Sequence, residues 1–108
     1  MPPDGPDRRK FPRLKIGVPI ELRPEGNEFP IRGATSDLSL NGCYVEMTFT
    51  FPVGTVLEIS LQLAEPVLAL AAVVTCDTQV GNGIQFTRML PEDQDRLRSY
   101  LEAAEKSQ

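Results

Sequence analysis

Apolar and polar residues alternate along most of this chain. The alternation has a period of two over residues 16–22, 43–47 and 57–63, which is the spacing expected of strands with one buried face. A further extended run is predicted at 29–34. Residues 67–74 are nearly all apolar and indicate a strand that is either buried on both sides or lines a barrel.

Local signals predict where these strands are interrupted. Pro19 cannot donate a ladder hydrogen bond, so its strand is expected at an edge or beside a bulge. The polar segment 35–42 is interpreted as a loop that leads into the next strand. The Gly-Asn-Gly sequence at 81–83 predicts a tight hairpin turn, after which Ile84 and Phe86 open the last strand.

The pattern changes at Pro91. Proline suits the first turn of a helix, and the acidic residues that follow it suit the positive end of the helix dipole. Apolar residues then recur as one helical stripe, namely Leu97, Tyr100, Leu101 and Ala104. This stripe is expected either to cap the open end of a barrel or to pair with another subunit.

We expect one domain of 108 residues in three parts. A flexible leader at 1–12 carries part of a basic motif, a β-barrel occupies 13–90, and an amphipathic helix follows at 91–105. Short strands at this spacing predict a mainly β fold, a small six-stranded antiparallel (split) β-barrel with a C-terminal amphipathic α-helix.

The composition argues against an enzyme. The chain has no histidine, so Ser–His–Asp and Cys–His nucleophiles cannot be assembled and the commonest zinc ligand is missing. Cys43 and Cys76 lie in apolar stretches and are interpreted as small buried hydrophobes, with a disulfide or a reactive thiol as the alternative. We expect neither a metal nor a cofactor.

No apolar run reaches the roughly 20 residues that span a bilayer. The first residues are polar and rich in proline and show no cleavable signal. The protein is therefore expected to have no membrane span and to stay in the cytoplasm.

The net charge of −4 conceals an asymmetry. Residues 1–15 carry a charge of +3, whereas the remaining 93 residues carry −7. A short basic arm on an acidic body can meet an anion. The alternative is an ordinary solvated, disordered tail.

Two short motifs lie about 24 residues apart in the chain. Arg9 and Arg13 enclose three residues, and Asp37, Ser39 and Gly42 form the sequence Asp-x-Ser-x-x-Gly. In this order, on an all-β pattern of this length, the two motifs resemble those of the PilZ family. That family consists of bacterial receptors for the second messenger cyclic di-GMP.

The chemistry of the first motif suits that ligand, which has two phosphodiester charges and two guanines. The guanidinium groups of Arg9 and Arg13 offer planar forks of donors that match a phosphate or the O6 and N7 edge of guanine, and arginine also stacks on purines. Lys10 offers charge without the fork, which makes it a poorer candidate.

The second motif offers acceptors. The carboxylate of Asp37 can accept from both N1–H and N2–H₂ of guanine, and Ser39 can donate or accept. Gly42 allows a close backbone approach or a positive φ. Without the arginine pair, the same residues read as an ordinary Asx or Ser turn at the start of a strand.

The resemblance covers residues 8–104 and adds one further candidate. It implies that Arg8 favours a stacked pair of ligands, often between two subunits, and the alternative is a solvated charge. Asn41 is interpreted as a turn residue. Tyr44 is either a platform for a base or ordinary sheet surface.

The expected ligand is therefore cyclic di-GMP, held by Arg8, Arg9, Arg13, Asp37, Ser39 and Gly42. We expect a leader that is mobile without ligand, that folds over the ligand when it binds, and that relays the signal to an effector protein.

The alternative is a PilZ-like adaptor that binds protein and no nucleotide. A barrel for single-stranded nucleic acid is disfavoured by the acidic body and the few aromatic residues. The free protein is expected to be a monomer or a weak homodimer.

Overall fold

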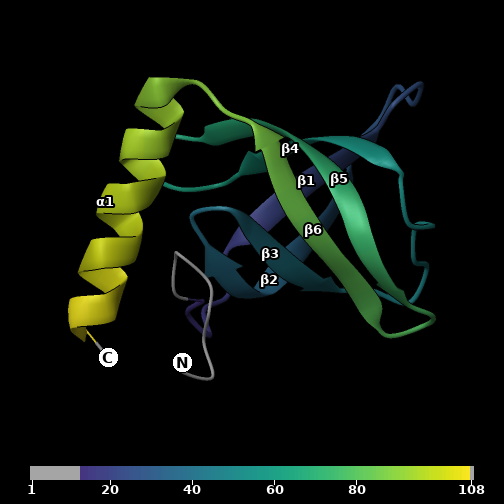
Figure 1. Cartoon of the computed structure of the whole chain (residues 1–108), viewed down its shortest axis with the longest axis horizontal. Coiled ribbons are helices and arrows are strands. Elements are labelled where there is room, and N and C mark those ends of the chain that lie inside the picture. The colour runs from purple at the N-terminus through teal and green to yellow at the C-terminus, as the bar shows by residue number, and fades with distance from the viewer. Residues whose placement is uncertain (1–12, 108) are drawn as a thin grey trace, which may run out of the picture.

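The strands of this protein close into a single barrel, with one helix packed at its end (Figure 1). The computed structural model describes residues 13–107. Neighbouring strands are antiparallel in the order β1-β2-β3-β6-β5-β4. The elements are β1 (Pro19–Pro24), β2 (Ile31–Ser39), β3 (Gly42–Glu46), β4 (Val56–Leu61), β5 (Val67–Asp77), β6 (Gly81–Arg88) and α1 (Pro91–Ser107). The predicted six-stranded antiparallel barrel with a C-terminal helix is confirmed.

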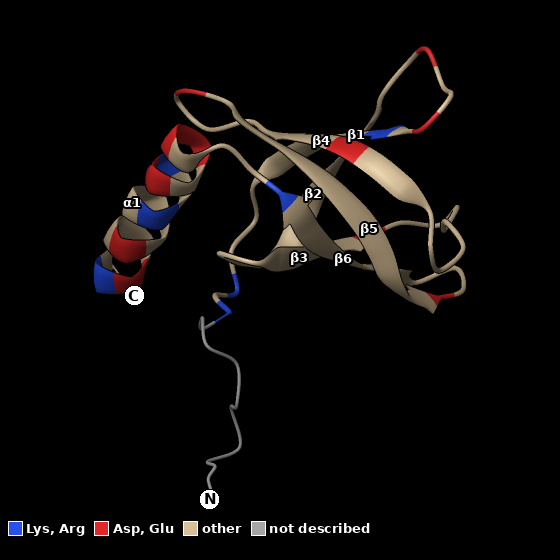
Figure 2. Cartoon of the chain, turned by 45° about the horizontal axis from the view of Figure 1, so that its top comes forward, with Lys and Arg blue, Asp and Glu red and all other residues tan. Residues whose placement is uncertain are grey.

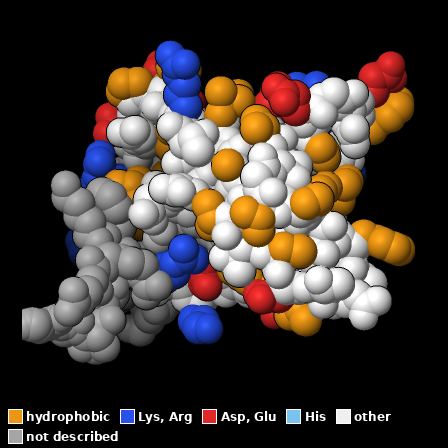
Figure 3. Space-filling model, turned by 45° about the vertical axis from the view of Figure 1, so that its right-hand side comes forward, with side chains coloured by type: hydrophobic (Ala, Val, Ile, Leu, Met, Phe, Trp, Pro, Cys, Tyr) orange, Lys and Arg blue, Asp and Glu red, His pale blue; other side chains and the backbone are white. Residues whose placement is uncertain are grey.

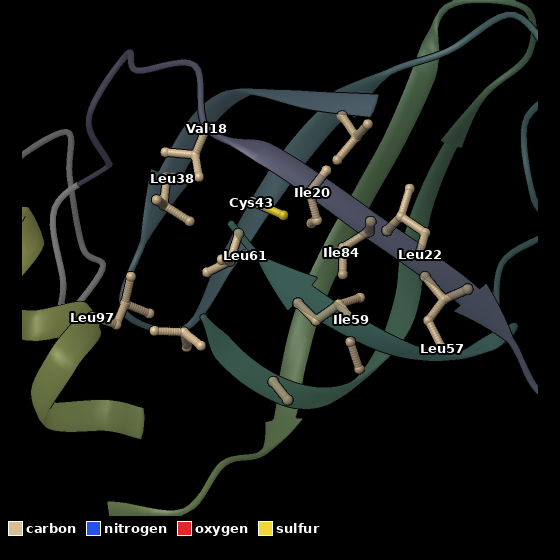
Figure 4. Close-up of a cluster of buried hydrophobic side chains, with 14 of the residues drawn as sticks. Val18, Ile20, Leu22, Leu38, Cys43, Leu57, Ile59, Leu61, Ile84 and Leu97 are labelled. Carbon is tan, nitrogen blue, oxygen red and sulfur yellow. The ribbon is translucent and has the colours of Figure 1, made fainter. Parts of the chain in front are cut away.

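The period-two pattern places one side of each strand inside the barrel. Leu57, Ile59 and Leu61 of β4 point into the barrel, where they pack with inward side chains of the other five strands (Figure 4). In β5 the alternate residues are buried, whereas Leu68 and Leu70 face outward and are exposed. The sequence left open whether this strand is buried on both sides or lines a barrel, and the structure shows that it lines a barrel. Its outer face is not covered by other described residues.

Closure of the barrel overturns the expectation for Pro19. The strand β1 pairs with both β2 and β4, so it lies neither at an edge nor at a register shift. Pro19 is the first residue of β1, where a missing N–H is tolerated. Its carbonyl oxygen still accepts a bond of 2.8 Å from the backbone N–H of Gln62.

The predicted turn at 81–83 was also wrong. These residues belong to β6. The chain reverses just before them, at residues 78–80, where Gln79 has a φ of 65°. Gly81 is required by its neighbours on β3, because a Cβ there would lie 2.5 Å from the carbonyl oxygen of Val45 and 2.6 Å from the ring of Tyr44. Glycine at this position allows a close approach to β3 and does not form a turn.

The helix α1 is tied to the barrel at its first turns. The buried carboxylate of Asp93 accepts from the backbone N–H of Leu68 at 3.4 Å and from Arg96 at 2.9 Å. Leu97 is fully buried in the core, so the apolar stripe caps the barrel.

Charged residues are dense along α1 and sparse on the strands (Figure 2). Among residues 13–107, no helix is long and apolar enough to cross a membrane.

The two cysteines differ in their surroundings. Cys43 is fully buried in the core, and burial, with a smaller contribution from the charge of Asp37, raises the pKa of its thiol to about 12. Cys76 is only partly buried, so the expectation of a buried hydrophobe is correct for Cys43 alone. Both thiols are free.

Candidate ligand-binding site

The first described residues are fixed to the start of the second motif by a backbone bridge. The N–H of Leu14 donates to the carbonyl of Leu38, and the N–H of Leu38 donates to the carbonyl of Leu14, both at 2.9 Å. Leu14 is buried, which anchors the bridge against the core. Residues 13 and 14 are therefore held beside β2.

This bridge brings one residue of each motif into contact. A terminal nitrogen of Arg13 donates to Oδ1 of Asp37 at 2.8 Å, across 24 positions of sequence. The two side chains keep 28% and 20% of their exposure, so the pair lies at the surface in a partly desolvated setting. Nε of Arg13 is buried and has no hydrogen-bond partner among the described residues.

A bulge directs Asp37 to the outer wall of the barrel. Along β2 the register with β3 shifts between Thr35 and Asp37, so Ser36 is the extra residue. Thr35 and Leu38 are buried, whereas Ser36 and Asp37 are both partly exposed. Strict alternation would send Asp37 inward with Thr35, and the bulge prevents this. The predicted loop at 35–42 is instead a bulged strand followed by a short turn.

Ser39 is committed to that turn. It is fully buried, and its Oγ lies 2.7 Å from Oδ1 of Asn41 and 3.2 Å from the carbonyl oxygen of Gly42. The backbone N–H of Asn41 in turn approaches the same Oγ at 3.3 Å. These contacts give Ser39 a local structural role and fit the interpretation of Asn41 as a turn residue.

Gly42 allows β3 to pass close to β6. A Cβ at this position would lie 2.4 Å from the carbonyl oxygen of Ile84, which no side chain tolerates. Its φ is not positive, so close approach rather than backbone conformation accounts for the glycine. Of the second motif, Asp37 alone presents a partly exposed side chain.

Tyr44 lies next to Asp37 in the pairing of β2 and β3. Its hydroxyl donates to Oδ2 of Asp77 at 2.7 Å, and its ring leans over Gly81. The hydrogen bond to Asp77 is the main cause that raises the pKa of Tyr44 to about 12. The ring is thus held in one orientation on the outer wall.

Sequence reasoning missed two features near these residues. The buried hydroxyl of Thr35 accepts from the N–H of Val18 at 2.9 Å and donates to the carbonyl of Ile16 at 2.8 Å, which ties the segment after the leader to β2. A groove of about 220 Å³ beside the turn carries Arg88 and Arg98. No spacing signal in the sequence links these distant positions.

Arg8 and Arg9 lie outside the described residues. Between residues 13 and 107 there is no group of three or more side chains suited to hold a metal ion.

The sequence of residues 7–103 matches the family model of the PilZ domain. The chain belongs to the PilZ family. A comparison with curated protein sequences gave no match. Solved structures share the fold of this PilZ domain at low sequence identity, and three of them follow.

One of these is the inhibitor of motility MotI/DgrA from Bacillus subtilis, with 18% identity and a TM-score of 0.81. The alignment covers 100% of the present chain and 58% of that protein. The PilZ domain of CeSA, from a cellulose-synthesizing bacterium, has 20% identity, a TM-score of 0.69 and coverages of 87% and 98%. The PilZ domain of YcgR from Escherichia coli, solved with c-di-GMP, has 15% identity, a TM-score of 0.71 and 94% coverage of both chains.

Proposed function

We propose that this PilZ domain is a receptor for cyclic di-GMP that acts in the cytoplasm and has no catalytic activity. The observation that carries the proposal is the contact between Arg13 and Asp37, which joins the two motifs at one point of the surface. The structural likeness to YcgR, a protein solved with this ligand, supports the choice of ligand.

The chemistry of the pair is suited to a ligand that is both anionic and rich in donors. The contact uses one nitrogen of Arg13 and Oδ1 of Asp37. A carboxylate has about four acceptor positions and a guanidinium has five N–H donors. Asp37 can therefore accept from the Watson–Crick edge of a guanine while it still holds Arg13, which leaves the other donors of Arg13 for a phosphate or a base.

The remaining motif residues have different roles in this proposal. Arg9 supplies a second guanidinium fork, and Arg8 either favours a stacked pair of ligands or is a solvated charge. Ser39 and Gly42 shape the turn and the close strand contact that hold Asp37 in place. Their contribution to ligand binding is thus indirect, through the position of the Asp37 carboxylate.

The signal passes through the leader in this proposal. Residues 1–12 close over the bound ligand from the bridge at Leu14, and the new surface meets an effector protein. Ordering the leader costs about 1–2 kcal/mol per residue, so the affinity lies below the sum of the contacts. This cost is what makes the leader responsive to the ligand.

A second candidate function is a PilZ-like adaptor that binds protein alone. The observation that favours it is that Arg13 already donates to Asp37 and the hydroxyl of Ser39 already bonds within the turn, so part of the polar capacity of the two motifs is used inside the protein. A protein partner would need none of these groups.

Titration calorimetry separates the two functions. The receptor predicts saturable heat with cyclic di-GMP, no comparable heat with GTP or cyclic GMP, and a shallow dependence on salt. A single-stranded oligonucleotide serves as a further control, because polynucleotide binding falls steeply with salt. Folded protein that gives no heat with cyclic di-GMP would exclude the receptor and favour the adaptor.

A further inference from the structure

The outer wall of β4, β5 and β6 carries exposed leucines around one shallow hollow. Leu68, Leu70 and Leu90 keep 57%, 41% and 62% of their exposure and line the same space of about 290 Å³. Apolar side chains on this side of the barrel are visible in Figure 3. Single exposed leucines are ordinary on a surface, whereas three around one hollow indicate a contact site.

Two opposite charges flank the central leucine. The register places Glu58 of β4 opposite Leu70 of β5, and Leu70 opposite Arg88 of β6. The three residues therefore form one row across the wall, in the order acidic, apolar, basic.

The two charges differ in their pairing. Glu58 is in an ion pair with Arg23 of β1. Arg88 is exposed and forms no ion pair within residues 13–107. A partner that presents a carboxylate beside an apolar side chain would complete this row.

A second copy of this chain presents that combination. A two-fold axis parallel to β5, lying in the contact plane above Leu70, places the two Leu70 side chains face to face. The same rotation exchanges the left and right sides of the wall, so Glu58 of each protomer lies over Arg88 of the partner. An axis along the row would oppose like charges instead. Only the first arrangement is self-complementary, as an isologous contact requires.

We propose that the outer wall of β4, β5 and β6 is the contact surface of a weak homodimer, with Leu70 at the two-fold axis and two Glu58–Arg88 ion pairs between the protomers. The barrel order separates β4 and β5 from β2. Neither Arg13 nor Asp37 lines the hollow under this contact, and its test needs no nucleotide.

Sedimentation velocity over a wide range of protein concentration tests the dimer. The wild type is expected to show a concentration-dependent dimer. Glu58→Arg and Arg88→Glu each create two like-charge contacts and are expected to weaken it at least about tenfold, the effect of 1.4 kcal/mol. Val53→Glu, at an exposed apolar residue outside this wall, is the control and should leave the dimer unchanged.

Mixing the two charge variants gives the sharpest readout. Glu58→Arg then carries two arginines in the row, and Arg88→Glu carries two glutamates. The mixture is therefore expected to form a heterodimer more tightly than either variant forms a homodimer. Circular dichroism of each variant checks that both are folded. A wild type that stays monomeric up to millimolar concentration, or a mixture that associates no better than its components, would overturn the proposal.

Discussion

The barrel wall is built differently at β2–β3 and at β4–β5. The pairing of β4 with β5 runs from Val56 to Leu61 without a register shift, and its residues alternate between core and surface. The pairing of β2 with β3 contains a bulge and ends in a turn closed by Ser39. Both walls contribute side chains to the core, but only the irregular wall also directs a carboxylate, that of Asp37, outward at a bulge.

The difference shows that one small barrel combines a regular wall with a wall whose irregularities fix the position of an exposed carboxylate. In the regular wall a residue's role follows from its place in the alternation. In the irregular wall each deviation fixes a position: the bulge turns Asp37 outward, and the Leu14–Leu38 bridge brings Arg13 to it. Substitutions at individual residues of this wall are expected to show how much each deviation contributes to stability.

The largest effect is expected at Gly42. In Gly42→Ala the new Cβ would lie 2.4 Å from the carbonyl oxygen of Ile84, so the contact of β3 with β6 must open. We expect a loss of about 3 kcal/mol in the free energy of unfolding, at the upper end of the cost of overpacking. Urea unfolding measures it. Gly17→Ala is the matched control, since its Cβ would lie at an ordinary 3.5 Å from Thr35; equal losses in both variants would refute the steric argument.

A smaller effect is expected at Ser39. Ser39→Ala removes the buried hydroxyl that bonds to Asn41, which costs about 1 kcal/mol in the free energy of unfolding. The same substitution at Ser99, exposed on α1, is the control and should cost nothing. A Ser39→Ala protein as stable as the Ser99→Ala protein would show that the hydroxyl does not hold the turn.

The smallest effect is expected at Tyr44 and concerns pH. Its pKa is raised from 10.0 to about 12, chiefly by the hydrogen bond to Asp77. Because the folded pKa lies above the ordinary one, the stabilisation is complete below pH 10 and is lost as the pH rises toward 12.

Ultraviolet absorbance of ionised tyrosine measures this titration. In a Tyr100→Phe background Tyr44 is the only tyrosine, and it should ionise late while the protein stays folded. Asp77→Asn should move the ionisation back toward its ordinary range. Ionisation near pH 10 in the folded protein with Asp77 intact would contradict the hydrogen bond.

The regular half of the molecule is the half that sequence predicts well. Strict alternation at 57–63 located β4 and its inward leucines, because in that wall the period of two is never broken. The turn signal at 81–83 failed for a physical reason. A Cβ at Gly81 would collide with the carbonyl oxygen of Val45 and the ring of Tyr44 on another strand, and no local rule contains those neighbours.

The site was predictable only in its parts. The motif resemblance assigned Arg13 and Asp37 to the same ligand, but it did not predict that the two side chains are in contact. Their contact depends on a bulge at Ser36 and a bridge at Leu14, which are long-range features of the backbone. The sequence also assigned Ser39 to the ligand, which stays a prediction, and the hydrogen bond of its hydroxyl to Asn41 in the turn could not be predicted from the motif.

One calorimetric comparison tests the central claim most directly, namely that Arg13 and Asp37 form two sides of one ligand site. Cyclic di-GMP is titrated into the wild type, Arg13→Ala, Asp37→Ala and the control Arg32→Ala, which removes an arginine with 83% of its side chain exposed. The account predicts saturable binding by the wild type and the control, and at least about tenfold weaker binding by the other two, equivalent to 1.4 kcal/mol each. Wild-type affinity in both Arg13→Ala and Asp37→Ala would contradict it.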